Sequence, residues 1–273
     1  HGSGKLFWPD GSSFDGKFVD GKPLKGTRLY KGGDRYEGTV NEILQKHGKG
    51  KYFWPDGSSF DGKFVDDKPI NGTRLYLDGD RYEGTVNEKW QMHGKGKYFF
   101  KNGGYLVAEF QNDKYSYGTR SYKNGDLYEG NFNQKEERSG KGKLYYKDGS
   151  SFEGEFRYNS VFKGKHLWPD GEFFVGEFRD NKFLQGTFLY ADGSKYEGAW
   201  AKNVQNGNGK LSLADGSWYE GTVIDGFLGG QGHYFEDGRK KEVSWDGKRM
   251  WKKGFFGGLK VVPAKYPSWL GGK

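Results

Sequence analysis

Aromatic and polar residues alternate in short stretches along this 273-residue chain, and glycine-containing turns separate the stretches at regular intervals. In residues 50–54 and 58–64, aromatic side chains are interleaved with Lys, Ser, Asp and Gly, and Pro55-Asp56-Gly57 stands between them. Aromatic residues and threonines favour strands. Trp54-Pro55-Asp56-Gly57 is typical of a type I turn followed by a left-handed glycine, which joins two antiparallel strands. The pattern therefore predicts a β-hairpin.

This hairpin is one member of a long internal repeat. Residues 5–42 and 51–88 are identical at 32 of 38 positions, with an offset of 46, and each block holds two hairpins. Turn glycines recur every 22 to 24 residues at Gly11, Gly33, Gly57, Gly79, Gly103, Gly125, Gly149, Gly171, Gly193, Gly216 and Gly238. The sequence thus predicts an all-β fold, an elongated single-layer antiparallel β-meander of eleven hairpin repeats over residues 1–247. A basic aromatic C-terminal cap or tail is expected over residues 248–273.

The length of the hairpin loop also predicts which residues face each other. It places Lys51 opposite Asp61, Gly50 opposite Gly62 and Tyr52 opposite Phe60. The same register gives complementary pairs elsewhere: Lys5–Asp15, Lys143–Glu153, Lys210–Glu220, Thr27–Glu37 and Thr73–Glu83. Two pairs, Lys97–Val107 and Lys165–Val175, lack this complementarity.

One face of the predicted sheet is aromatic, with glycines between the rings, and the other carries Lys, Thr, Asp and Glu. We expect most rings to pack on one another as the core. Because a single layer has nothing behind it, we expect others to stay half exposed and to form a trough for a protein partner. The candidate partner-binding rings are Trp8, Tyr30, Tyr36, Trp54, Phe60, Tyr82, Phe100, Tyr128, Tyr146, Trp168, Tyr190 and Tyr196.

A recurring motif runs through the repeats: Tyr36-Glu37-Gly38, then His47-Gly48-Lys49-Gly50, then Asp56-Gly57. The Tyr-Glu-Gly triplet returns at residues 82–84, 128–130, 196–198 and 219–221. This motif resembles the MORN repeat family (membrane occupation and recognition nexus) over about residues 1–247. The resemblance implies an elongated single-layer β-sheet, a scaffold or targeting role, and no catalysis by the repeats.

The chain departs from the motif at several positions. Leu106-Val107-Ala108 and Lys241-Glu242-Val243 replace the aromatic–acid–glycine triplet, and Phe174-Val175-Gly176 lacks the acid. Units with a short linker keep only one glycine of the Gly-x-Gly pair, as at Gly26 and Gly72. We expect local bends or altered ring packing there, and a specific contact near Leu106.

No sequence motif for catalysis is present: neither a P-loop, nor a Gly-x-Ser-x-Gly elbow, nor a His-Glu-x-x-His pair. His1, His47 and His93 recur at one repeat phase, so two strand pairs, roughly 19 Å, should separate them, too far for one metal ion. We therefore expect no enzyme activity, no metal and no cofactor. Cysteine is absent, which excludes disulfides and thiolate sites and fits a cytoplasmic location.

Positive charge is concentrated at the C-terminal end. Residues 248–273 hold seven Lys or Arg and no acid, which leaves 37 basic and 36 acidic residues before them. This segment is interpreted either as a cap over the last hairpin or as a patch for anionic phospholipid. The candidate lipid-binding residues are Lys248, Arg249, Lys252, Lys253, Trp251, Phe255 and Phe256. A nearly neutral array is a poor ligand for nucleic acid, so none is expected.

The sequence therefore predicts a non-enzymatic scaffold that binds protein partners along the aromatic trough or the sheet edges, as in a cytoskeletal or ciliary assembly. A membrane-association module that uses the basic tail is the first alternative. A targeting region of a larger enzyme is the second. Open strands at both ends of a meander also allow end-to-end homo-oligomers.

Overall fold

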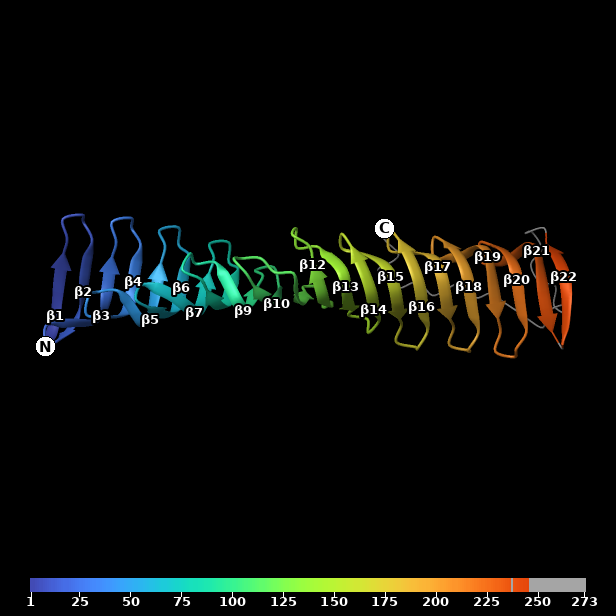
Figure 1. Ribbon diagram of the computed structural model, residues 1–273, viewed down its shortest axis with the longest axis horizontal. Coiled ribbons are helices and arrows are strands. Elements are labelled where there is room, and N and C mark those ends of the chain that lie inside the picture. The colour runs from blue at the N-terminus through green and yellow to red at the C-terminus, as the bar shows by residue number, and fades with distance from the viewer. Residues whose placement is uncertain (237, 246–273) are drawn as a thin grey trace. The chain divides into compact units, whose positions relative to one another are not determined.

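The computed structural model describes residues 1–236 and 238–245, which contain 22 strands and no helix (Figure 1). The chain divides into two compact units, His1–Glu136 and Glu137–Lys273. Unit 1 holds β1 (Gly2–Phe7), β2 (Ser13–Val19), β3 (Lys22–Leu29), β4 (Arg35–Val40), β5 (Lys46–Phe53), β6 (Ser59–Val65), β7 (Lys68–Leu75), β8 (Arg81–Val86), β9 (Met92–Phe99), β10 (Gly104–Phe110), β11 (Tyr117–Tyr122) and β12 (Leu127–Phe132). Unit 2 holds β13 (Arg138–Tyr145), β14 (Ser151–Arg157), β15 (Ser160–Leu167), β16 (Phe173–Arg179), β17 (Lys182–Leu189), β18 (Lys195–Ala201), β19 (Val204–Ser212), β20 (Trp218–Ile224), β21 (Phe227–Glu236) and β22 (Arg239–Trp245).

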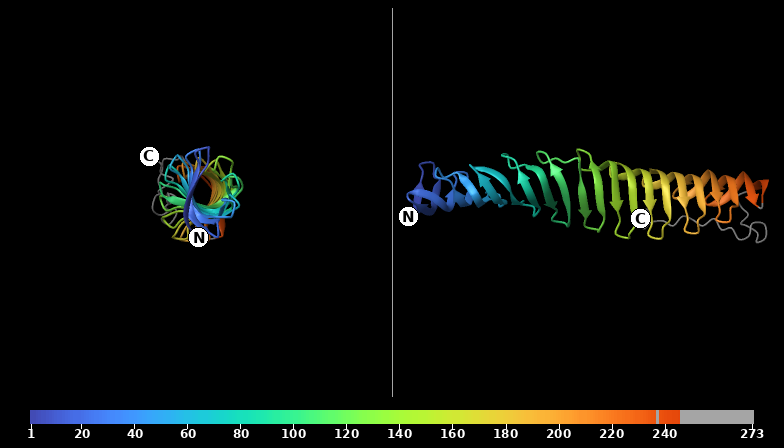
Figure 2. Two further views of the ribbon diagram at one scale, coloured as in Figure 1. Left: turned by 90° about the vertical axis from the view of Figure 1, so that its left-hand side faces the viewer. Right: turned by 60° about the horizontal axis from the view of Figure 1, so that its bottom comes forward.

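Within each unit, every strand pairs antiparallel with the next one along the chain, so consecutive strands lie side by side (Figure 2). This arrangement confirms the predicted all-β meander of hairpins. The predicted cap or tail, with its lipid-binding candidates Lys248, Arg249, Trp251, Lys252, Lys253, Phe255 and Phe256, lies outside the described residues.

The predicted register is confirmed. Lys51 lies opposite Asp61, Gly50 opposite Gly62 and Tyr52 opposite Phe60. Three Lys–acid pairs form ion pairs, with N–O distances of 2.9 Å for Lys5–Asp15, 3.3 Å for Lys143–Glu153 and 3.9 Å for Lys210–Glu220. The two mismatched pairs, Lys97–Val107 and Lys165–Val175, also stand where the loop length places them.

The predicted turns form at one edge of each unit. The backbone N–H of Gly57 donates to the carbonyl of Trp54 at 3.1 Å, and the N–H of Trp54 donates to the carbonyl of Ser58 at 3.0 Å. All eleven turn glycines have φ between 76° and 98°, a region that residues with a side chain rarely adopt. Turn glycines therefore fix the register of every hairpin.

Replacing Gly57 by valine is expected to lower the free energy of unfolding by about 1–3 kcal/mol, because a β-branched residue is strained at a φ of 93°. The strain is conformational rather than steric, since the nearest atom to an added Cβ is Leu77 Cδ1 at 3.9 Å. Chemical denaturation measures the loss. Gly57→Asn is the control, because asparagine accepts this conformation, and an equal loss in both variants would contradict the turn assignment.

The opposite edges carry a second kind of turn. Two-residue turns in which both φ values are positive, as in type I′ turns, join several hairpins. They are Asp20-Gly21, Asp66-Asp67, Asn112-Asp113, Tyr158-Asn159, Asp180-Asn181, Lys202-Asn203 and Asp225-Gly226. Residues 41–45 and 87–91 form longer turns, in which Leu44 and Trp90 have φ values of 63° and 64°.

A row of glycines crosses the strands of each unit and creates the core. Gly16 lies opposite Gly26, and Gly26 lies opposite Gly38. A Cβ added to Gly26 would lie 2.6 Å from the Cα of Gly16 and 2.8 Å from Cζ of Phe14. Rings therefore lie flat over bare backbone, as predicted. The face that carries these rings is called the inner face below.

Candidate functional site

The twelve candidate rings of the inner face fall into two groups. Six are buried among their neighbours: Tyr36, Phe60, Tyr82, Tyr128, Trp168 and Tyr196. Six beside the turns are half-buried: Trp8, Tyr30, Trp54, Phe100, Tyr146 and Tyr190. The buried group is the core of the fold, so a partner has access only to the turn-side group.

Arginines that the sequence analysis did not single out cover the turn-side rings of unit 1. The guanidinium carbon of Arg28 lies 5.3 Å from the Trp8 ring centroid and 4.9 Å from that of Tyr30. Arg74 repeats the arrangement 46 residues later, at 4.9 Å from Trp54 and 4.7 Å from Tyr76. Such cation–π contacts stabilise the edge of the sheet. They also leave less ring surface for a partner than a bare trough would offer.

Trp90 is a second residue that sequence reasoning missed. It lies in the 87–91 turn, and its carbonyl accepts a 2.7 Å hydrogen bond from Nη1 of Arg74. Its ring packs against four rings of β5 and β6 and the adjoining turn, with centroid distances of 5.1 Å to Tyr52, 5.0 Å to Trp54, 5.4 Å to Phe60 and 5.9 Å to Phe64. The turn therefore folds back over the inner face and closes part of it.

In unit 2 a histidine takes the position that Arg28 and Arg74 occupy in unit 1. The ring of His166 is fully buried, 4.3 Å from the Trp168 centroid and 5.6 Å from that of Tyr146. Burial lowers the pKa of this imidazole to about 4, so it is neutral at pH 7. One repeat later the equivalent residue is the buried Phe188. His166 is therefore a core residue.

Acid is expected to destabilise unit 2 through His166. Below pH 6.5 the unfolded chain binds a proton that the folded chain takes up only near pH 4, so stability falls as pH drops. The expected loss between pH 7 and pH 5 is about 2 kcal/mol. Denaturation at both pH values measures it. His166→Phe should remove this part of the pH dependence, and an unchanged profile would contradict a neutral buried imidazole.

An opening in the sheet lies near Leu106, where the repeat motif is broken and a specific contact was expected. Leu106 takes the place of a ring, and Ala108 takes the place of a glycine opposite Gly118. β10 and β11 pair as far as Ala108–Gly118 and then separate, and they meet again only at the isolated Gln111–Lys114 bridge. The space between them is called the opening below, and its volume is about 1070 Å³.

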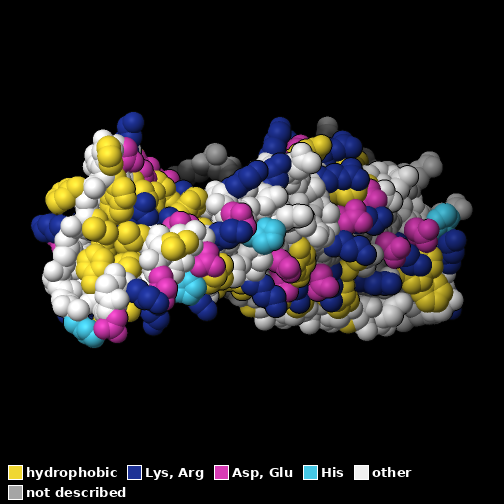
Figure 3. Space-filling model, turned by 60° about the vertical axis from the view of Figure 1, so that its left-hand side comes forward, with side chains coloured by type: hydrophobic (Ala, Val, Ile, Leu, Met, Phe, Trp, Pro, Cys, Tyr) yellow, Lys and Arg dark blue, Asp and Glu magenta, His cyan; other side chains and the backbone are white. Residues whose placement is uncertain are grey.

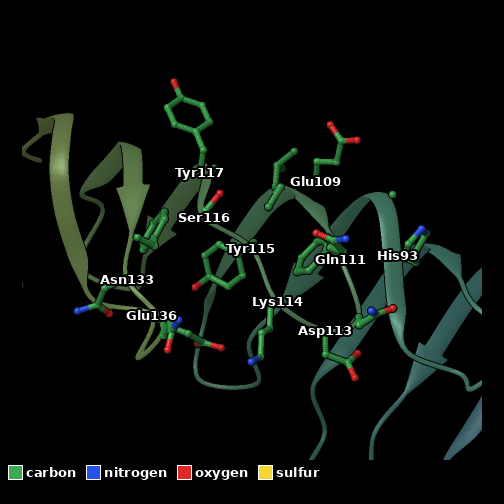
Figure 4. Close-up of a pocket in the computed structure, with 18 of the residues that line it drawn as sticks. His93, Glu109, Gln111, Asp113, Lys114, Tyr115, Ser116, Tyr117, Asn133 and Glu136 are labelled. Atoms are coloured by element: carbon green, nitrogen blue, oxygen red, sulfur yellow. The ribbon is translucent and has the colours of Figure 1, made fainter.

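The opening combines an apolar floor with a polar rim (Figure 4). Phe110 and Phe132 are buried beneath it, and the Tyr115 ring lies between them at centroid distances of 5.8 and 5.0 Å. Tyr115 stands in the middle of the view, and Tyr117 and Glu109 point to one side of it. The exposed rim residues are Glu109, Gln111, Asn112, Asp113, Lys114, Ser116, Tyr117 and Glu136.

The phenol of Tyr115 is the most unusual group of the opening. Its hydroxyl is buried and has no hydrogen-bond partner among the described residues. Burial is the main reason that its pKa is raised, and the nearby Glu136 carboxylate adds to the shift. A buried hydroxyl without a partner is costly, so a ligand that pairs with it gains affinity.

Metal and membrane sites were also sought. Within residues 1–236 and 238–245, no three His, Asp or Glu side chains are grouped closely enough to hold a metal ion. The described segments likewise contain no helix that could span a bilayer.

These features define a hairpin-repeat protein with an aromatic core. The sequence matches the MORN repeat family over residues 1–13, 45–59, 91–105, 128–151, 174–195, 196–218 and 219–238. The chain is therefore a MORN-repeat protein, as the Tyr-Glu-Gly motif indicated. No curated protein sequence matches it significantly.

Among solved structures, the chain has weak likeness to CPAP domains. A point mutant of the TCP10 domain of Danio rerio CPAP is 11% identical, with 82% of this chain and 99% of that chain covered and a TM-score of 0.32. The SAS-4 (dCPAP) TCP domain of Drosophila melanogaster, in complex with a proline-rich motif of Ana2, is 13% identical, with coverage of 81% and 90% and a TM-score of 0.22. Such scores carry no inference about function.

Proposed function

We propose that the chain is a non-enzymatic scaffold that binds an extended segment of a protein partner in the opening between β10 and β11. The observation that carries this proposal is the separation of two paired strands over an aromatic floor. Concave sites with an apolar floor and a few polar groups are the usual form of binding sites. A cytoskeletal or ciliary setting for such a scaffold remains part of the proposal.

The rim favours a basic partner segment. Glu109, Asp113 and Glu136 stand against the single positive charge of Lys114. Phe110, Tyr115 and Phe132 would contact an apolar side chain of the segment, and the Tyr115 hydroxyl would pair with its backbone. β10 and β11 both have unpaired backbone beyond Ala108–Gly118, so an extended chain suits the space better than a helix.

Affinity capture with matched variants tests this function. Tyr117→Ser and Asp113→Asn change exposed rim residues, so they should leave the fold intact while they weaken capture of the partner. Tyr158→Ser is the control, because Tyr158 is exposed in a turn of unit 2, away from the opening. A partner that binds all three variants and the parent chain equally would exclude the opening as its site.

Anionic phospholipid is a second candidate ligand because residues 248–273 carry seven of the eight net positive charges. Clustered Lys and Arg attract acidic lipid, and added salt screens the attraction. Replacing Lys248, Arg249, Lys252 and Lys253 by serine should then abolish sedimentation with anionic liposomes. Persistent sedimentation of that variant would exclude the basic segment as the lipid site.

A further inference from the structure

Strand β1 is an edge strand, whereas its counterparts in the repeat are central strands. Among the described residues β1 pairs only with β2. Residues 1–8 correspond to residues 47–54, which include most of β5, and β5 lies between β4 and β6. β9, 46 residues further on, lies between β8 and β10. These two central strands show what the free side of β1 lacks.

The first missing group is a phenol ring. In β5, a Cβ added to Gly50 would overlap the Tyr36 ring, which lies flat over this glycine from the neighbouring β4. Tyr82 covers Gly96 in the same way. At Gly4, the equivalent position of β1, the nearest atoms belong to the edge of the Phe18 ring, at 3.3 and 3.5 Å. The surface over Gly4 therefore has room for a ring that no described strand supplies.

The second missing group is a carboxylate. Lys51 of β5 stands between two acids, Glu37 on β4 and Asp61 on β6. Lys5, its counterpart, has an acid on one side, Asp15, at 2.9 Å. The side of Lys5 that faces the free edge has no strand beside it in the described chain, so one more carboxylate fits there.

The third missing group is a guanidinium. Arg35 of β4 lies 4.2 Å above the Phe53 ring, and Arg81 of β8 lies 4.1 Å above the Phe99 ring. Phe7, the counterpart of these two rings, is 76% exposed. Hydrophobic side chains gather at this end of unit 1, which comes forward in Figure 3. An exposed aromatic ring at an open sheet edge is a docking feature rather than a stabilising one.

We propose that the free edge of β1 is a docking surface for an antiparallel strand of a second polypeptide that carries the sequence Arg-Tyr-Glu-Gly. In the register of β4 on β5, the arginine covers Phe7, the glutamate pairs with Lys5 and the glycine lies opposite Gly4. The tyrosine ring then fills the space over Gly4. Backbone hydrogen bonds supply affinity, and these side chains supply the specificity.

A second copy of this chain does not offer that strand. Its Arg-Tyr-Glu-Gly sequences, residues 35–38 and 81–84, lie in β4 and β8, which are already paired on both sides. At the other end of the array, β22 places Lys241, Glu242 and Val243 in the register of the tyrosine, glutamate and glycine. β22 therefore keeps the acid but lacks the ring and the glycine, and the partner is a different MORN-type strand.

A synthetic peptide with the sequence of residues 33–40 tests the proposal on the full chain. The peptide is expected to slow amide hydrogen exchange of residues 2–7 by at least about tenfold, because edge amides gain hydrogen-bond partners. The peptide with Tyr36→Ser and the peptide with Gly38→Val should give no protection. Equal protection by all three peptides, or protection by the parent peptide elsewhere in the chain, would overturn the proposal.

Variants of the edge provide the matched receptor controls. Gly4→Ala blocks the space for the ring, and Phe7→Ser removes the exposed ring that the arginine covers, so each should weaken peptide binding at least about tenfold. Because Phe7 is exposed, Phe7→Ser should not unfold the protein, and Tyr158→Ser should bind the peptide normally. Sedimentation without peptide covers the remaining occupant: self-association that protects residues 2–7 would assign the edge to a second copy and contradict the proposal.

Discussion

Replacing Gly26 by alanine is expected to destabilise unit 1 by more than about 3 kcal/mol, although it adds only one methyl group. The added Cβ would lie 2.6 Å from the Cα of Gly16, in contact with the Asp15 carbonyl and 2.8 Å from the Phe14 ring. Two of these three neighbours are backbone atoms of a paired strand, and the ring is fully buried. The strands must therefore move apart, and chemical denaturation should show a large shift in midpoint.

Gly32→Ala is the control for that experiment. Gly32 lies six residues away in an exposed turn, and the nearest atom to an added Cβ is the mobile carboxylate of Asp34 at 3.1 Å. The expected change is within about 0.5 kcal/mol. Similar losses at both positions would mean that general strand propensity, rather than contact across the glycine row, explains the glycine content.

Replacing Trp90 by alanine is expected to cost about 3 kcal/mol, the second large effect. The ring contacts Phe60 and Phe64, both of which are fully buried, and its removal leaves a cavity over the inner face. The turn itself should survive, because its hydrogen bonds run from the backbone N–H of Trp90 to Asn87 and from the N–H of Asn87 to Gln91. Thermal denaturation measures the loss.

Lys89→Ala is the matched control because Lys89 lies in the same turn and is exposed. Its stability should stay close to that of the parent chain. If Trp90→Ala proved equally neutral, the turn would not hold the inner face closed, and the rings beneath Trp90 would be open to a partner.

Local chemistry explains why the register was predictable from the sequence. A type I turn followed by a left-handed glycine allows one pairing of the flanking strands, so Trp54-Pro55-Asp56-Gly57 was enough to place Lys51 opposite Asp61. The glycine row followed from the same register. The family resemblance added the repeat count but no contact.

Contacts between repeats were not predictable in this way. Trp90 lies in a turn, off the phase of the ring positions, and it reaches Phe60 only because the turn folds back over the inner face. Arg28 lies on the aromatic face, but its place between Trp8 and Tyr30 depends on how neighbouring turns stack. The broken motif at Leu106 indicated an unusual site, whereas the separation of β10 and β11 beyond Ala108 appears only in three dimensions.

Photo-crosslinking from the rim of the opening tests the central claim most directly. A benzophenone amino acid is placed at Tyr117 in one protein and at Tyr158 in another, since both side chains are exposed but only Tyr117 lines the opening. The scaffold account predicts a discrete protein adduct from position 117, lost when Asp113→Asn is added, and none from position 158. Equal labelling from both positions, or adducts with lipid alone, would contradict it.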